Sequence, residues 1–174
     1  MTDPAIRPAE SADAPALAAL YRAAYGRLAD AGFPSSAADA DADAVRGWLA
    51  ERECWVATRA RGHAHRTDAG DAGDAGRDGD IVGAVQLRER DDWPCPEVCR
   101  LAVAPEQQRT GIGAALLDHA EGVVANRGGD RVRLRSFSDH PFLLDWYADR
   151  GYERIGLQEL DHRPFDAPVL ERRL

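Results

Sequence analysis

The sequence contains no lysine, so arginine alone supplies its permanently positive side chains. It has only three cysteines, an odd and sparse set that excludes a disulfide framework and fits a reducing compartment. No apolar run approaches the roughly 18 residues that a membrane-spanning helix needs. The first residues show no basic segment followed by an apolar block, so no secretory signal is visible. These absences predict a cytoplasmic protein without a membrane partner.

The charge and composition that are present describe a globular chain. Hydrophobic residues make up 44% and charged residues 30% of the 174 positions, which predicts a single domain over residues 1–174 with a substantial core. The formal net charge of −8 weighs against a nucleic-acid partner, because phosphate binding favours a basic surface. The same charge leans toward a cationic small molecule as substrate.

Apolar spacing predicts strands and helices in the order β-α-α-β-β-β-α-β-α-β-β, which is an α/β (α+β) domain. The expected strands cover residues 5–7, 54–58, 81–87, 98–104, 132–137, 152–157 and 169–174. The expected helices are a run that follows Asp13 and ends before Gly32, then residues 40–52 and 112–127, and a short helix after Pro141.

Residues 61–80 differ in kind from the rest of the chain. They repeat Asp-Ala-Gly from Asp68 to Gly76 and offer no apolar side chain larger than alanine before the next strand. Such a segment cannot bury enough surface to offset its ordering entropy, so we expect a flexible hairpin tip. His63 and His65 lie here beside aspartates, but a His-x-His in a low-complexity loop is more often incidental than a metal site. We therefore expect no metal.

The turn from Gln108 to Gly113 stands between an expected strand and an expected helix. Gly111 and Gly113 carry no Cβ, so backbone N–H groups and the positive helix end can converge on an anion there. No Lys-Ser/Thr pair follows, which excludes a P-loop, and Leu116 stands where a dinucleotide fingerprint has its third glycine. The spacing alone does not distinguish an anion site from an ordinary helix start.

Two longer patterns resolve this ambiguity. The segment 101–117, Leu-Ala-Val-Ala-Pro-Glu-Gln-Gln-Arg-Thr-Gly-Ile-Gly-Ala-Ala-Leu-Leu, resembles the acyl-CoA motif (Gln/Arg)-x-x-Gly-x-(Gly/Ala) of the GCN5-related N-acetyltransferases, the GNAT superfamily. The segment 146–152, Trp-Tyr-Ala-Asp-Arg-Gly-Tyr, is similar to that family's second signature. The resemblance covers about residues 97–156 and implies the GNAT fold, a mixed central sheet of about seven strands flanked by about four helices.

The resemblance also implies how acetyl-CoA would be held. Backbone amides from Arg109 to Ala114 would bind the pyrophosphate, and the strand at 101–103 would splay from its neighbour and pair with the pantetheine amides. Tyr147 matches the family tyrosine that protonates the departing thiolate. In all, the resemblance assigns cofactor binding to Leu101, Ala102, Val103, Gln108, Arg109, Thr110, Gly111, Ile112, Gly113, Ala114, His140 and Tyr147.

Tyr147 is chemically suited to that role, because a phenol with a reference pKa near 10 can donate a proton to a thiolate. The alternative is an ordinary core aromatic on a helix. His140 departs from the family pattern, which often has Asn seven residues before the tyrosine. It can replace that contact, transfer a proton, or simply start a helix.

Acylation of an amine also needs a proton acceptor. Glu97 is the candidate base, because strand alternation places it on the same face as Cys99, Leu101 and Val103. Alternatively, water or His140 accepts the proton, or Glu97 is a solvated residue at a strand end without a catalytic role. Cys99 shares that expected face, but the family usually transfers directly to the amine, which disfavours an acyl-cysteine intermediate.

The sequence thus predicts an N-acyltransferase that moves an acetyl group from acetyl-CoA to a primary amine of a small-molecule or peptide acceptor, without a metal. A non-catalytic acyl-CoA sensor, a different acyl-CoA donor, and an unrelated nucleotide-phosphate binder are the rival interpretations. The acceptor would contact the least recognisable parts of the chain, about residues 13–52 and 156–174. A homodimer is a common arrangement in this family.

Overall fold

The computed structural model describes residues 4–59, 79–137, 140, 142–160 and 166–174. One seven-stranded sheet runs through them in the order β1-β2-β3-β4-β5-β7-β6. The strands are β1 (Ala5–Pro8), β2 (Glu53–Arg59), β3 (Asp80–Arg88), β4 (Glu97–Val103), β5 (Arg131–Arg135), β6 (Glu153–Gln158) and β7 (Ala167–Arg173). The helices are α1 (Ala14–Asp30), α2 (Ala42–Glu51), α3 (Ile112–Asn126) and α4 (Leu143–Asp149), with single 3₁₀ turns η1 (Ser11–Asp13) and η2 (Pro105–Gln107).

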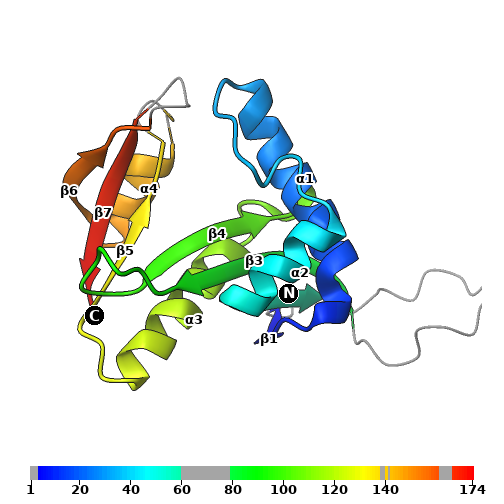
Figure 1. Cartoon of the computed structure of the whole chain (residues 1–174), viewed down its shortest axis with the longest axis horizontal. Coiled ribbons are helices and arrows are strands. Elements are labelled where there is room, and N and C mark those ends of the chain that lie inside the picture. Colours follow the sequence, from blue (N-terminus) through cyan, green and yellow to red (C-terminus); the bar gives the residue numbers. More distant parts are fainter. Residues whose placement is uncertain (1–3, 60–78, 138–139, 141, 161–165) are drawn as a thin grey trace, which may run out of the picture.

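The helices cover the sheet on two faces (Figure 1). α1 and α2 pack on one face over β3 and β4, around Leu17, Tyr21 and Val45. α3 packs on the opposite face across β2 to β5, around Leu116 and Leu117. The predicted element order and the mixed sheet are confirmed, and the four helices agree with the expected number.

The glycine turn leads into α3 as its spacing predicts. Gly111 caps the helix with φ 90°, a left-handed conformation that glycine adopts without steric cost. Leu116, Leu117 and Ala120 are fully buried on the inner side of the helix, which confirms the predicted apolar stripe. Beyond the helix Gly128 has φ 83°, again a glycine conformation, and the chain turns into β5.

β4 is irregular at its centre, and this corrects one prediction. Cys99 pairs with Gln86 and Ala102 with Ala84, so one extra residue is accommodated between them, and Arg100 has φ 47°. Such a bulge reverses the alternation of side chains along the strand. The prediction that Glu97 shares its face with Leu101 and Val103 is therefore wrong. Leu101 and Val103 pack on the side of the sheet that α3 covers, and Glu97 does not.

β4 also separates from β5 immediately after its start. The parallel pairing between these strands is recorded at Glu97 and Arg133, and the bond from Arg133 N–H to the Pro96 carbonyl (3.1 Å) belongs to the same point. Beyond it the two strands diverge, which confirms the predicted splay. Main-chain groups of β4 on that side are left for other partners.

The predicted hairpin tip at residues 61–80 lies almost wholly outside the described residues, as do His63 and His65. The strands on both sides of it, β2 and β3, pair antiparallel down to Arg59 and Asp80, so the hairpin itself is confirmed. Within the ranges that the structure describes, no helix has both the length and the apolarity of a membrane span.

Candidate functional site

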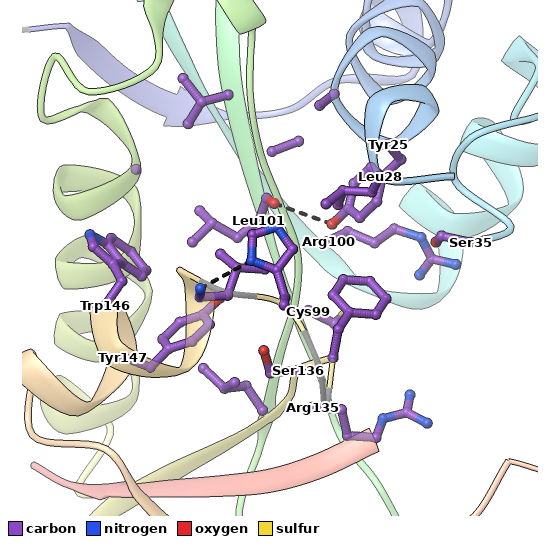
Figure 2. A pocket seen from close by; sticks show the side chains of 18 of the residues that line it. Tyr25, Leu28, Ser35, Cys99, Arg100, Leu101, Arg135, Ser136, Trp146 and Tyr147 are labelled. Atoms are coloured by element: carbon purple, nitrogen blue, oxygen red, sulfur yellow. Dashed lines mark hydrogen bonds between the residues drawn. The ribbon is translucent and has the colours of Figure 1, made fainter. Parts of the chain in front are cut away.

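A cavity of about 750 Å³ lies along β4 where that strand leaves β5. Its walls fall into two groups, one on each side of β4 (Figure 2). The turn side contains Gln108, Arg109, Gly111, Gly113, Ala114, Trp146 and Tyr147. The arginine side contains Arg27, Ser35, Arg88, Glu97, Arg100 and Arg135.

The turn side is built mainly from main chain. Gly111 has no side-chain cap to offer, and the first bond of α3 runs from Ala115 N–H to the Gly111 carbonyl (2.9 Å). The N–H groups of the first turn before Ala115 therefore have no partner inside the helix, and the helix dipole adds a partial positive charge. Arg109 adopts φ 62°, and Gln108 donates to the Val103 carbonyl (3.3 Å). The arrangement can bind a phosphate group.

Two glycines near this turn have different physical roles. A Cβ on Gly113 would meet only ordinary contacts, at 3.5 Å from Val103 and 4.0 Å from Trp146. A Cβ on Gly83 would approach Leu116 to 2.8 Å and Ile112 to 2.9 Å, so that glycine is required where β3 packs under α3. Packing of the protein therefore tolerates a Cβ at Gly113 but not at Gly83.

Tyr147 projects from α4 into the cavity beside Trp146, and the two ring centroids lie 4.9 Å apart (Figure 2). Its second neighbour is Tyr152, at 5.5 Å. Burial raises the pKa of Tyr147 well above 10, so the phenol keeps its proton at neutral pH. A protonated hydroxyl group on the turn side of the cavity can act as an acid.

His140 lines the cavity and lies just before α4, whose N-cap residue is Phe142. Its Nδ1 accepts the backbone N–H groups of Phe142 (3.3 Å) and Leu143 (3.2 Å), as an N-cap side chain does. Burial lowers its pKa. A neutral ring with Nδ1 engaged carries its proton on Nε2, so His140 can donate a hydrogen bond into the cavity but is poorly placed to accept a proton.

Glu97 is buried, with 1% of its surface exposed, and arginines hold both of its oxygens. Arg88 donates to Oε2 (3.0 Å from Nε) and Arg135 donates to Oε1 (2.8 Å), while Arg90 lies 3.4 Å from Oε2. Burial alone would raise the pKa of Glu97, but the bonds from Arg88 and Arg135 outweigh it and lower the pKa. The carboxylate is ionised at neutral pH and is a weak proton acceptor.

Most of the predicted site residues meet at this cavity, with two exceptions. Thr110 is exposed and its hydroxyl donates to the Gln107 carbonyl (2.6 Å), while the Ile112 side chain is buried in the core under α3. Only their main-chain groups can serve a ligand. Burial raises the pKa of Cys99 to about 11, which leaves its thiol protonated and disfavours it as a nucleophile.

Apart from Glu97, the predictions missed the residues of the arginine side. Tyr25 on α1 reaches across to the Leu101 carbonyl and donates to it (3.2 Å). Arg100 and Ser35 lie together on that side of β4 (Figure 2). One signal was available: Arg100 is a charged residue in the middle of an otherwise apolar strand segment.

Comparisons with known proteins agree with this geometry. The family model described as "Acetyltransferase (GNAT) family" matches residues 27–152, which is most of the chain. The chain is 28% identical over 164 residues to the S-(2-succino)cysteine N-acetyltransferase of Bacillus subtilis (strain 168), covering 90% of this chain and 88% of that protein.

Solved structures show the same fold. A GCN5-related N-acetyltransferase from Rhodopseudomonas palustris superposes with a TM-score of 0.73 at 21% identity, covering 100% of this chain and 98% of that one. The PaiA N-acetyltransferase from Thermoplasma acidophilum, in complex with coenzyme A, superposes with a TM-score of 0.71 at 16% identity, covering 99% and 100%.

Proposed function

The chain belongs to the GNAT acetyltransferase family, and from this premise we propose that it transfers an acetyl group from acetyl-CoA to a primary amine of a small molecule. The observation that carries the proposal is the meeting of three features at one cavity. These are the free N–H groups of the turn from Gly111 to Ala114, the splayed β4 and the protonated Tyr147. A relative that is named for a cysteine derivative supports a small-molecule acceptor.

The turn would bind the CoA pyrophosphate through the backbone amides of Arg109 to Ala114, and β4 would pair with the pantetheine amides. The thioester would then lie beside Leu101 to Val103, where a strand N–H polarises its carbonyl. The Leu101 carbonyl already accepts the Tyr25 hydroxyl and the Val103 carbonyl accepts Gln108. We therefore expect β4 to act toward the donor chiefly through its N–H groups.

The chemical step needs a base and an acid. The neutral amine attacks the polarised carbonyl, a tetrahedral intermediate forms, and the C–S bond breaks as Tyr147 protonates the thiolate sulfur. Among the described cavity residues Glu97 is the only carboxylate, so the amine proton would pass to it directly or through water. Because its pKa is lowered, Glu97 would hold that proton only briefly before it is lost to solvent.

The testing experiment is release of free CoA thiol from acetyl-CoA over a broad library of amines. We expect turnover with at least one class of acceptor, and competition for the donor by CoA but not by ATP or NAD. Tight CoA binding without turnover would instead favour the non-catalytic sensor. Equal protection of the fold by ATP or NAD in thermal unfolding would favour a general nucleotide-phosphate binder.

The acyl group is tested in the same assay. The proposal takes acetyl as the group transferred, and succinyl-CoA and longer acyl-CoA donors are measured against it. A higher kcat/KM with one of those donors would support an acyltransferase that transfers that donor's acyl group and not acetyl. The homodimer and the cytoplasmic location stay predictions.

A further inference from the structure

The charge of the cavity is opposite to that of the whole protein. The chain carries a formal net charge of −8, yet five arginines and one carboxylate line this cavity. Arg109 lies on the turn side, where a diphosphate accounts for it. The other four, on the arginine side, are Arg27, Arg88, Arg100 and Arg135. An acceptor that enters on that side meets positive charge, which is the reverse of what the net charge alone suggests.

Three of these four arginines are already accounted for. Arg88 and Arg135 share the buried carboxylate of Glu97. Arg27 is exposed on α1, where water solvates its charge. Arg100 alone is half-buried without an acidic partner in the part of the chain that the structure describes.

The Arg100 guanidinium is held in place and incompletely satisfied. Its Cζ lies 3.7 Å from the centroid of the Trp48 ring, so the group stacks on an aromatic face. Its Nε is buried and makes no hydrogen bond. Because Nε is out of reach of solvent, the Nη groups are the donors that a ligand in the cavity can use, and a stacked guanidinium suits two-point binding of a carboxylate.

Ser35 supplies a second donor at the same place. Ser35 and Arg100 line the same cavity, and Figure 2 shows both on the α1 side of β4. The Ser35 Oγ accepts the N–H of Ala37 (3.3 Å), which leaves its own proton for another acceptor. Arg100 and Ser35 line the same cavity as Leu101, whose main chain would lie beside the thioester. A molecule held by Arg100 and Ser35 would therefore lie in the cavity in which the acetyl group is transferred.

We propose that the acceptor amine carries a carboxylate group, and that Arg100 binds this carboxylate with Ser35 as a second donor. The assignment rests on the proposed acetyl transfer and adds the chemical class of the acceptor, an amino acid or a related amino carboxylate. It replaces the cationic acceptor toward which the net charge leans. The bulge at Arg100 is what turns this side chain away from the α3 face and toward Trp48.

The test compares matched acceptors and matched variants. Amino acids are assayed against their own carboxamides, and ω-amino carboxylates against the corresponding amines. Each kcat/KM is calculated from the concentration of the neutral amine form, so that differences in amine pKa do not enter the comparison. We expect the carboxylates to have a kcat/KM at least about tenfold higher, as a charge-assisted bond gives. Arg100→Gln should abolish that preference chiefly through the acceptor KM, with Arg100→Lys intermediate and the KM for acetyl-CoA unchanged. Arg154→Gln, an exposed arginine on β6 outside the cavity, is the control.

A binding arm needs no turnover. N-acetylated amino acids and their carboxamides are titrated into the CoA complex of the wild type and of Arg100→Gln. The wild type should prefer the acids about tenfold or more, and the variant should not. Equal binding and equal rates for acids and amides, or a preference that survives Arg100→Gln, would overturn the carboxylate assignment and leave the transferase intact. Preferential binding of the acids with no turnover of any amine would contradict the proposed acetyl transfer and support the carboxylate site at Arg100.

Discussion

The two sides of the cavity are built by different means. The turn side uses main-chain N–H groups from one continuous stretch, Gln108 to Ala114, with Tyr147 added from α4. The arginine side uses side chains from α1 and the loop after it, from β3, from the centre of β4 and from the end of β5. A site made of local backbone has a local sequence signature, whereas a site assembled from distant side chains has none. The difference explains why the proposed donor site could be predicted from the sequence and the proposed acceptor site only from the structure.

The largest expected effect lies on the turn side, at Tyr147. Tyr147→Phe removes the proposed acid and keeps the ring that packs against Trp146 and Tyr152. We expect kcat to fall by about 10²–10⁴-fold while the KM for acetyl-CoA changes little. Steady-state kinetics with the best acceptor measure this. Full activity in the variant would remove the acid role and make Tyr147 a packing residue.

Glu97→Gln perturbs the arginine side alone. It removes the negative charge that Arg88 and Arg135 share, and we expect a loss of roughly 2–4 kcal/mol in unfolding free energy. The lowered pKa means that the wild-type carboxylate stabilises the fold fully above its ordinary value of 4.5, and that this stabilisation is lost as pH falls below 4.5 through the folded-state pKa.

Denaturant unfolding at several pH values checks both parts. The variant should lose the component of acid sensitivity that Glu97 contributes. Because Glu97 is also the proposed proton acceptor, kcat should fall in the variant as well. Lowered stability with unchanged kcat would make Glu97 a structural anion only, and unchanged stability would contradict the role of the bonds from Arg88 and Arg135.

The turn side is tested by two glycines that differ in what surrounds them. Gly113→Glu should raise the Kd for CoA by about tenfold or more, because a carboxylate in the first turn of α3 would repel the diphosphate, and should change the Tm little, since the first turn of a helix favours an acidic side chain. Gly83→Ala should instead cost about 1–3 kcal/mol of stability through overpacking against Leu116 and Ile112.

Calorimetric titration of CoA and thermal unfolding separate the two glycine variants. Unchanged CoA affinity in a stable Gly113→Glu protein would mean that the turn is an ordinary helix start. Acceptor preference should be the same in Gly113→Glu and in the wild type, since that variant leaves the arginine side untouched.

The smallest effect is expected at Trp48. Trp48→Leu removes the aromatic face that holds the Arg100 guanidinium, worth about 0.5–2 kcal/mol, so the acceptor KM should rise a few-fold to tenfold. The KM for acetyl-CoA serves as the internal reference and should not move. An equal rise in both would show that Trp48 supports the whole cavity through α2 and not Arg100 in particular.

The order of elements and the turn side could be predicted because short-range patterns determine them. Gly111 takes the left-handed cap, and the stripe through Leu116 and Leu117 defines the buried face of α3. The face of Glu97 could not be predicted, because period-two alternation assumes a regular strand and the bulge at Arg100 breaks it.

The positive charge of the arginine side could not be predicted from the sequence either. Net charge sums over the whole chain, whereas the cavity gathers four arginines that lie far apart in sequence. Pairing decides which of them is available to a ligand: Glu97 engages Arg88 and Arg135 and leaves Arg100. Only the three-dimensional arrangement contains that information.

The most direct test of acetyl transfer follows the acetyl group itself. Wild-type protein is incubated with isotopically labelled acetyl-CoA and an amino-acid acceptor, and the products are resolved by mass spectrometry. The account predicts one labelled acetyl group on the acceptor nitrogen for each CoA released, at a rate that Tyr147→Phe reduces by about 10²-fold or more. CoA release with the label recovered as free acetate, or no label on nitrogen for any acceptor in the library, would contradict it.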